Sequence, residues 1–287
     1  MRVGVNRERR GIKVRGATSA DARNPTRDHV RHVLLTGASG GLGSALAQAL
    51  AGRGDRVTLM GRDASRLAAA VALCQSVPSG GHETICCDVT NAAHMHDALL
   101  SADRDGPVDI LIANAGKGGS AVLAPASGEP LDLARSIIDV NVLGVINSIA
   151  PLLERMVERR QGHIVIVSSM AARQGLAEAP VYAASKAAVS VYGHGLRRLL
   201  APHNVRVTIV EPGYIATPMS ASLPFQRPFE LSAARAAELI VRGIDRGAAE
   251  IIFPWQLRWA TWLLRLLPMG VVDRALTFAS AQTRSRR

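Results

Sequence analysis

Aromatic side chains are scarce in this chain. They account for 3% of its 287 residues, although 48% of the residues are hydrophobic. The apolar content therefore consists mainly of Ala, Leu and Val, a composition typical of helices layered on a parallel sheet. Enough of it is present for a sizeable buried core, which argues against disorder of the main body. We therefore expect an α/β fold.

Cysteine and long apolar runs are also rare. The three cysteines, Cys74, Cys86 and Cys87, cannot all pair with one another, and the last two lie in an apolar run that is predicted to be a buried strand. A reducing compartment is the simpler interpretation. The chain has no apolar run near its start and no uninterrupted apolar run of membrane-spanning length, so neither secretion nor a spanning helix is predicted. We expect a cytoplasmic protein.

Acidic residues are few at the two ends of the chain and balanced in its middle. The formal net charge of +11 would suggest a nucleic-acid partner. However, residues 1–31 hold nine basic and three acidic residues, residues 258–287 hold six and one, and residues 32–257 hold 19 of each. A nucleic-acid-binding domain shows a basic face within its fold, so no nucleic-acid partner is predicted.

The chain divides into three segments. Residues 1–30 are rich in Arg, contain Pro25 and lack helical periodicity, and we interpret them as a flexible basic arm. An organellar transit peptide is the less favoured alternative, because this segment holds three acidic residues and little Ser. Residues 31–254 are predicted to form one main domain, and residues 255–287 an amphipathic helical extension with a basic tail.

Short apolar runs alternate with helical patterns along the main domain. The segments between these runs, such as LGSALAQALAG, are long enough for the crossover helices that parallel strands require. Seven runs are thus predicted as strands: HVLLT, RVTLM, ETICC, VDILIA, HIVIVS, VRVTIV and EIIF. No internal repeat is visible. The pattern predicts a doubly wound, seven-stranded parallel sheet, a Rossmann fold, with helices on both faces.

A glycine-rich turn, TGASGGLG, follows the first predicted strand and precedes a helix. Its glycines are Gly37, Gly41 and Gly43. Glycine allows a tight turn and close approach of a phosphate, while the helix N-terminus offers N–H donors and a positive dipole. Without its context such a turn is more often only a turn, but the strand before it and the helix after it favour an anion site.

Tyr182 and Lys186 lie four residues apart in PVYAASKAAVSVY, which is predicted to be helical, so both side chains can reach one cleft. An ammonium about 4 Å away, at an effective dielectric of about 20, would contribute roughly 4 kcal/mol and lower the phenol pKa from ~10 to ~7. Tyr182 would then be a proton donor or acceptor at neutral pH. The alternative is a half-buried Tyr beside a solvated Lys.

Further motifs follow in order along the chain. They are NAG at residues 114–116, DVNVLG at 139–144, SS at 168–169, the Tyr182 pair and PGYIAT at 212–217. Together with the Gly-x3-Gly-x-Gly turn they resemble the short-chain dehydrogenase/reductase family over roughly residues 32–254. This resemblance implies that residues 31–254 form a Rossmann-type, NADP-binding catalytic domain that transfers hydride between a nicotinamide and a carbonyl or secondary alcohol.

The resemblance also implies a catalytic tetrad of Asn141, Ser169, Tyr182 and Lys186. Ser169 would orient the substrate oxygen, Tyr182 would transfer the proton, and Lys186 would lower the pKa of Tyr182 and hold the nicotinamide ribose. Asn141 would help to hold a water that connects Lys186 to solvent, although a polar residue buried between helices is its alternative. Ser168, directly before Ser169, is the less favoured candidate for the serine.

The remaining cofactor contacts are implied by the same resemblance. Asp88 has capping of the next helix as its alternative, and Thr217 could be only a turn residue. The full set, besides Tyr182 and Lys186, is Gly37, Ser39, Gly41, Leu42, Gly43, Arg62, Asp88, Val89, Asn114, Ala115, Gly116, Pro212, Gly213, Ile215 and Thr217.

Arg62 directs the choice of cofactor. The second predicted strand ends in Gly61, and where an NAD site would usually offer a carboxylate, Arg62 follows, whose guanidinium suits a 2′-phosphate. Asp63 is the competing candidate, but it directly precedes a helical run and is more simply a helix N-cap. We expect NADP, with NAD as the alternative.

The substrate side is predicted to be apolar. Residues 218–232 are rich in Pro, Phe and small residues and by family analogy would cover the substrate. Apolar side chains there indicate an apolar or lipid-like alcohol or ketone, although such residues more often simply pack. These side chains are Met219, Leu223, Phe225 and Phe229.

All three tryptophans, Trp255, Trp259 and Trp262, lie within eight residues, at spacings of four and three that align them on one helical face. Packing on the domain or on a partner subunit is the favoured interpretation, and contact with a membrane surface is the alternative. His94 and His96 point to different sides of a helix, so no metal is predicted.

The sequence therefore predicts an NADP-preferring alcohol dehydrogenase or carbonyl reductase that acts on an apolar small molecule. We expect a homo-oligomer. Two other functions are weighed against this one: an NADP-binding regulatory protein without turnover, and a membrane-peripheral scaffold.

Overall fold

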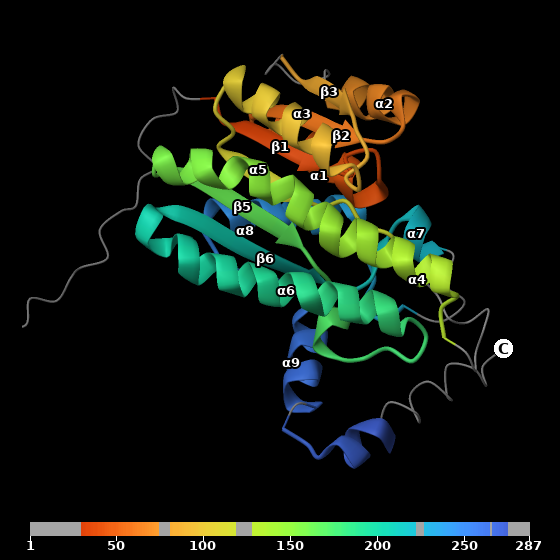
Figure 1. Ribbon diagram of the computed structural model, residues 1–287. Coiled ribbons are helices and arrows are strands. Elements are labelled where there is room, and N and C mark those ends of the chain that lie inside the picture. Colours follow the sequence, from red (N-terminus) through yellow and green to blue (C-terminus); the bar gives the residue numbers. More distant parts are fainter. Residues whose placement is uncertain (1–29, 75–80, 119–127, 222–226, 265, 275–287) are drawn as a thin grey trace, which may run out of the picture.

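One parallel sheet organises the chain (Figure 1). The structure, a computed structural model, describes residues 30–74, 81–118, 128–221, 227–264 and 266–274. The sheet has the order β3-β2-β1-β4-β5-β6-β9, and each neighbouring pair is parallel. Its strands are β1 (His32–Thr36), β2 (Arg56–Gly61), β3 (Glu83–Cys86), β4 (Ile110–Ala113), β5 (Gly162–Val167), β6 (Val205–Pro212) and β9 (Glu250–Phe253). The predicted seven-stranded Rossmann fold is confirmed.

Helices cover both faces of the sheet, because successive strand residues point to opposite sides. Val33 and Leu35 pack with the helices of one face, whereas Leu34 packs with those of the other. The first face carries α1 (Gly41–Ala51), α2 (Ala64–Cys74) and α8 (Ala233–Asp245). The second carries α3 (Ala92–Arg104), α5 (Gly144–Glu158) and α6 (Pro180–Leu200). Two apolar cores result, one on each side of the sheet.

A long helical stretch leads from β4 to β5. It consists of α4 (Leu131–Ile138), the π-helical turn η2 (Asp139–Leu143) and α5. Among the described residues it is the one helix long and apolar enough to cross a membrane. In α5, however, Ile149, Leu152 and Met156 are fully buried in the protein core, as in the core helix of a globular fold.

Shorter elements complete the described chain. They are η3 (Met170–Arg173), η4 (Ala201–His203), α7 (Pro218–Ala221), α9 (Trp255–Leu264) and the small parallel pair β7 (Ile215–Ala216) and β8 (Leu231–Ser232). The predicted basic arm, apart from Val30, lies outside the described residues, as does the end of the C-terminal tail.

The prediction that ETICC is a buried strand is wrong. Within the sheet β3 pairs only with β2 and is therefore an edge strand, so Glu83, Thr84 and Cys86 are exposed. Cys87, directly after the strand, is buried, and all three cysteines have free thiols.

The strand order places the candidate site. It reverses between β1 and β4, so the turn after β1 and the NAG motif after β4 lie next to each other at the carboxyl edge of the sheet, the position where open α/β sheets bind ligands. The segments that follow β5 and β6 begin at the same edge.

Candidate active site

The glycine turn after β1 leaves no space for side chains. Gly37 has φ +65°, and a Cβ on it would lie 2.7 Å from Ala115 Cα. A Cβ on Gly41 would lie 2.9 Å from the Thr217 side chain, and one on Gly43 would collide with the Gly37 carbonyl oxygen. Within the described chain no side chain caps the N-terminus of α1. The turn thus presents backbone to the cleft, as an anion site requires.

Asn114 fastens this turn to the end of β4. Its Nδ2 donates to Thr36 O at 3.0 Å and to Gly37 O at 3.2 Å, and Thr36 Oγ1 accepts from the backbone N–H groups of Asn114 and Ala115. The Asn114 amide is therefore engaged in holding the glycine turn, and the predicted contact of residues 114–116 with the adenosine ribose stays a prediction.

Gly116 lies between the residues predicted to bind a cofactor and those of the predicted tetrad. A Cβ on it would lie 3.3 Å from Lys186 Nζ and 3.5 Å from Asn141 Oδ1. The residues of the glycine turn, the NAG motif and the predicted tetrad are thus brought together at one edge of the sheet.

Helix α6 carries Tyr182 and Lys186 into this edge. Lys186 is buried, its Nζ lies 5.9 Å from the centre of the Tyr182 ring, and it donates to Val167 O at 3.0 Å. The Ser169 side chain, which follows β5, lies close enough to the Tyr182 hydroxyl to act on its pKa, and it accepts from Ala171 N at 3.1 Å. The two predicted partners of Tyr182 therefore both lie beside it.

Ser168 points the other way. Its hydroxyl is buried, donates to Lys186 O at 2.8 Å and accepts from Ser190 Oγ at 2.8 Å. Ser190 Oγ also lies 2.9 Å from the buried carboxylate of Glu211, so its single hydroxyl hydrogen is shared between Ser168 and Glu211, and Glu211 pairs with Arg173. This network fixes α6 against the sheet, and it leaves Ser169 as the serine that faces Tyr182.

Burial determines the acidity of the pair. It raises the pKa of Tyr182, the nearby Ser169 hydroxyl acts in the opposite direction, and Tyr214 raises this pKa further. Burial also lowers the pKa of Lys186 to about 8. The expectation of a phenol pKa near 7 is therefore wrong for the chain by itself, because loss of hydration disfavours the charged forms of both groups.

Asn141 is fully buried in the π-helical turn η2. Its Oδ1 accepts from Lys117 N at 2.7 Å, and its Nδ2 donates to Lys117 O at 3.0 Å and to Ser185 Oγ at 2.9 Å. Such turns frequently occur at functional sites. The amide joins α6 to the segment after the NAG motif. Asn141 is therefore a polar residue buried against a neighbouring helix, as in the alternative interpretation, and it also lies close to Lys186, as the family resemblance implies.

Two arginines lie near the end of β2. Arg62 is largely exposed and lies 3.7 Å from Asp88. Arg66, which the sequence analysis missed, donates from its Nη2 to Ser39 O in the glycine turn at 2.9 Å. The sequence feature that could have pointed to Arg66 is its position four residues after Arg62, in the first turns of α2. Asp63 accepts from Arg66 N and from the Ser65 hydroxyl, so its predicted role as the N-cap of α2 is confirmed.

Asp88 does not cap the next helix. Its carboxylate accepts from the backbone and hydroxyl of Thr90, and the cap of α3 is Asn91, whose side chain accepts from His94 N. Burial acts to raise the pKa of Asp88, but the Thr90 hydrogen bonds and the Arg62 charge outweigh it and hold this pKa below its usual value. The capping alternative for Asp88 is therefore wrong.

The other predicted contacts lie along the same edge. Val89 is buried against Gly144 of α5, and Leu42 packs on the core. The Thr217 hydroxyl accepts from Ser220 N, as expected of a turn residue, and the Thr217 side chain also packs against Gly41 of the glycine turn. Pro212 ends β6, Gly213 N donates to Phe253 O at 2.7 Å, and Ile215 is buried.

Glu129 is a second residue that the sequence analysis missed. Its buried carboxylate, from the segment before α4, accepts from Val181 N at 3.1 Å and from Tyr182 N at 3.5 Å. A negative charge at the N-terminus of a helix is stabilising, so Glu129 helps to fix the first turn of α6. No spacing rule links Glu129 to that turn, 52 residues away.

The predicted substrate cover is only partly described. Met219 and Phe229 are exposed, and a Cβ on Gly118 would lie 3.1 Å from Met219 Cγ. Leu223 and Phe225 lie outside the described residues. Tyr214 is close enough to Tyr182 to affect its pKa, so it adds a phenol to this side of the site.

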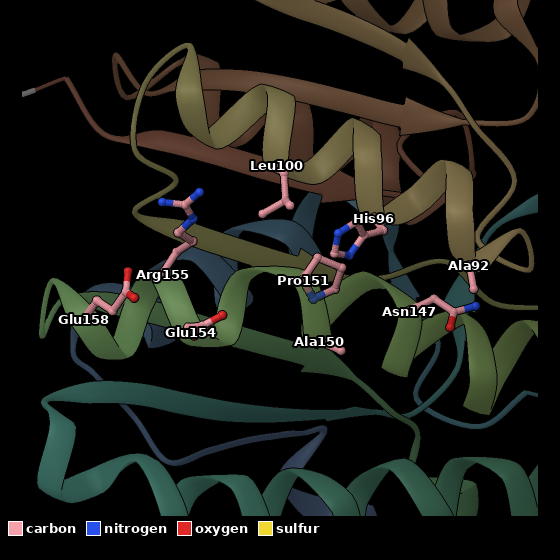
Figure 2. Close-up of a pocket in the computed structure, with 9 residues that line it drawn as sticks. All are labelled: Ala92, His96, Leu100, Asn147, Ala150, Pro151, Glu154, Arg155 and Glu158. Carbon is pink, nitrogen blue, oxygen red and sulfur yellow. The ribbon is translucent and has the colours of Figure 1, made fainter.

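A separate groove of about 650 Å³ lies between α3 and α5 (Figure 2). Its lining side chains include His96 and Leu100 of α3 and Asn147, Glu154 and Arg155 of α5. It contains none of the predicted site residues. In the described part of the chain, no three His, Cys, Asp or Glu side chains are grouped to hold a metal ion.

Known proteins resemble this chain in sequence and in fold. The sequence model described as short chain dehydrogenase matches residues 31–227. The chain belongs to the short-chain dehydrogenase family. An uncharacterized oxidoreductase of Myxococcus xanthus is 40% identical to this short-chain dehydrogenase over 248 residues, which are 85% of this chain and 96% of the relative.

Two further family members bear on the chemistry. The ketoacyl reductase HetN of a Nostoc species is 34% identical over 228 residues, 77% of each chain. A crystal structure of a short-chain dehydrogenase from Burkholderia cenocepacia in complex with NADP matches with a TM-score of 0.72 and 27% identity, covering 86% of this chain and 97% of that one. This short-chain dehydrogenase is thus an oxidoreductase by family.

Proposed function

We propose that this short-chain dehydrogenase is an NADP(H)-preferring oxidoreductase that transfers hydride between the nicotinamide and a carbonyl or secondary alcohol in an apolar substrate. The observation that carries the proposal is the convergence of Ser169, Tyr182 and Lys186 beside Gly116, next to a glycine turn built for an anion. A protein that only bound a cofactor would need the turn but not the Ser–Tyr–Lys arrangement.

The residues of the turn fit a dinucleotide. The uncapped N-terminus of α1 and the side-chain-free surface at Gly37, Gly41 and Gly43 suit the pyrophosphate. Asp88, Val89, Ala115 and Gly116 would border the adenosine half, and the segment from Pro212 to Thr217 would border the carboxamide. When bound, the nicotinamide supplies or accepts the hydride.

The proton is handled by Tyr182. Its raised pKa keeps the phenol protonated at neutral pH, which suits an acid that donates to the oxygen of a carbonyl as that oxygen gains charge. Ser169, beside Tyr182, would hold the same oxygen. Lys186, with a pKa of about 8, is mostly an ammonium at neutral pH and would stabilise the phenolate that remains.

The preference for NADP is supported by cations at the end of β2. Arg62 directly follows β2 and lies 3.7 Å from Asp88, and Arg66 contacts Ser39 O in the glycine turn. Guanidinium groups bind phosphate through paired hydrogen bonds, so both are candidates to hold a 2′-phosphate. The related structure with NADP agrees with this choice. For the substrate, the name of HetN and the apolar Met219 and Phe229 support a ketone on an apolar chain.

Substitution of Tyr182 tests the proposal. In Tyr182→Phe, kcat for NADPH-dependent reduction of a panel of ketones should fall about 10²–10⁴-fold, the contribution of general acid catalysis. The Kd for NADPH, measured by cofactor fluorescence, should change little. Tyr192→Phe, in the same helix and packed against the core, is the matched control and should keep both values. Turnover retained by Tyr182→Phe would refute the assignment.

A further inference from the structure

Helix α9 turns its apolar side chains away from the protein. Trp255, Trp259, Trp262 and Leu263 are 67%, 61%, 50% and 56% exposed. With 3.6 residues per turn these four share one face, whereas the half-buried Leu257, Thr261 and Leu264 share the opposite one. In a helix that packs on its own globular domain, the apolar face is buried and the polar face is exposed. Of the favoured interpretation, packing of the tryptophans on their own domain is therefore wrong, whereas packing on a partner subunit stays a prediction.

We call the exposed side of α9 formed by Trp255, Trp259, Trp262 and Leu263 the Trp face. Leu266, Met269 and Val271, in the turn and the short helical segment that follow, are exposed as well. Scattered exposed apolar residues are normal, but several large ones on one helical face mark an interaction surface.

The Trp face lies on a projecting element. Helix α9 contacts β9 and η3, and it extends below the sheet, away from the layers of α5 and α6 (Figure 1). On its inner side Leu257 packs near Gly213, where a Cβ would lie 3.2 Å from the leucine. The helix is thus held at its first turn and presents its outer side freely.

We propose that the Trp face docks on an anionic lipid surface. Tryptophan suits the bilayer interface because its ring is apolar while its N–H can stay hydrated. Arg258 is exposed on the edge of the same helix, Arg274 is exposed after it, and residues 258–287 hold six basic residues against one acidic one. Apolar burial and attraction to anionic headgroups therefore act in the same direction.

A second copy of the chain is the competing occupant. A symmetric contact would bring two Trp faces together with the arginines around them, so like charges would oppose it. An anionic bilayer meets the same charges with the opposite sign. The charge pattern thus favours the lipid surface.

The chain provides its own probe for this contact. Its three tryptophans all belong to the Trp face, so intrinsic fluorescence reports on that surface alone. Adding vesicles of phosphatidylglycerol to the full-length protein should shift the emission to the blue and sediment the protein. Vesicles of phosphatidylcholine should bind it at least about tenfold more weakly, and raising salt from about 0.1 M to about 0.5 M should weaken binding to phosphatidylglycerol.

Two variants distinguish vesicle binding through the Trp face from nonspecific adsorption through other exposed apolar side chains. The triple variant Trp255→Ser, Trp259→Ser, Trp262→Ser should lose at least about tenfold in vesicle partitioning. Val191→Ser, Leu199→Ser, which removes equally exposed apolar side chains from α6, should bind as the wild type does. Circular dichroism and NADPH binding unchanged in both variants would show that both are folded.

Two results would overturn the proposal. One is a wild-type protein that neither sediments with phosphatidylglycerol vesicles nor shifts its emission. The other is a wild-type dimer, seen by light scattering without lipid, that the triple tryptophan variant abolishes, because a second copy would then occupy the Trp face.

Discussion

Burial of Lys186 gives the protein a stability cost that depends on pH. The side chain is 5% exposed, and burial lowers its pKa from 10.5 to about 8. Between these values the unfolded chain still binds the proton that the native amine has released. The free energy of unfolding should therefore rise with pH from about 8 towards 10.5, by about 3 kcal/mol in total for this group.

Lys186→Met tests this cost, because Met keeps the stem of the side chain without the charge. At pH about 7.5 the variant should be more stable than the wild type in urea titrations, and the difference should shrink as the pH approaches about 10. Turnover should be lost in the same variant. A variant that is less stable at both pH values would show that the ammonium contributes more through Val167 O than its burial costs.

The positions of the proposed catalytic side chains could be predicted from the sequence, but their charge states could not. Tyr182 and Lys186 lie four residues apart on a helix, and Ser169, which the family resemblance singled out, follows strand β5 at the edge where open α/β sheets bind ligands. Their pKa values depend on how much water the fold removes, which no spacing records. Glu129 was missed for a related reason, since its contact with Val181 N joins segments distant in sequence.

Helix α6 offers a matched pair of glycines for a stability test. A Cβ on Gly193 would lie 2.8 Å from Ile209 Cγ1 and 3.1 Å from Ile166 Cδ1, both in the sheet, whereas a Cβ on Gly195 would have nothing within 4 Å. Gly195→Ala should raise the free energy of unfolding by about 0.5–1 kcal/mol, because Ala favours helix. Gly193→Ala should lower it by about 1–3 kcal/mol through overpacking. Equal effects in urea titrations would contradict the close packing of α6 on β5 and β6.

Element type was easier to predict than the surroundings of an element. All seven strands follow from short apolar runs, because a parallel sheet covered on both faces needs continuous apolar strands. Burial of ETICC was wrong because nothing local marks β3 as an edge strand. The same limit applies to α9, whose pattern showed an apolar face but not that the face is turned outward.

Stability of the whole molecule is linked to the cofactor, because a ligand that binds only the native state stabilises it. Saturation at about 100 times Kd adds about 2.7 kcal/mol. If Arg62 and Arg66 hold a 2′-phosphate, the charge-assisted contacts should make NADPH bind at least about tenfold more tightly than NADH, equivalent to about 1.4 kcal/mol. At equal concentration NADPH should therefore raise Tm by about 3 °C more than NADH does.

The double variant Arg62→Ala, Arg66→Ala should lose this difference and keep most of the NADH shift, because it removes only the Arg66–Ser39 O contact from the glycine turn and leaves Gly37, Gly41 and Gly43, which would seat the shared pyrophosphate, in place. The ratio of KM values for NADPH and NADH should move in parallel. Arg197→Ala, an exposed arginine at the far end of α6, is the matched control and should preserve the wild-type difference. If NADH stabilised the wild type as much as NADPH does, the arginines at the end of β2 would have no part in selecting the cofactor. The proposed preference for NADP would then be abandoned, whereas the Rossmann fold and the Ser169–Tyr182–Lys186 arrangement would be unaffected.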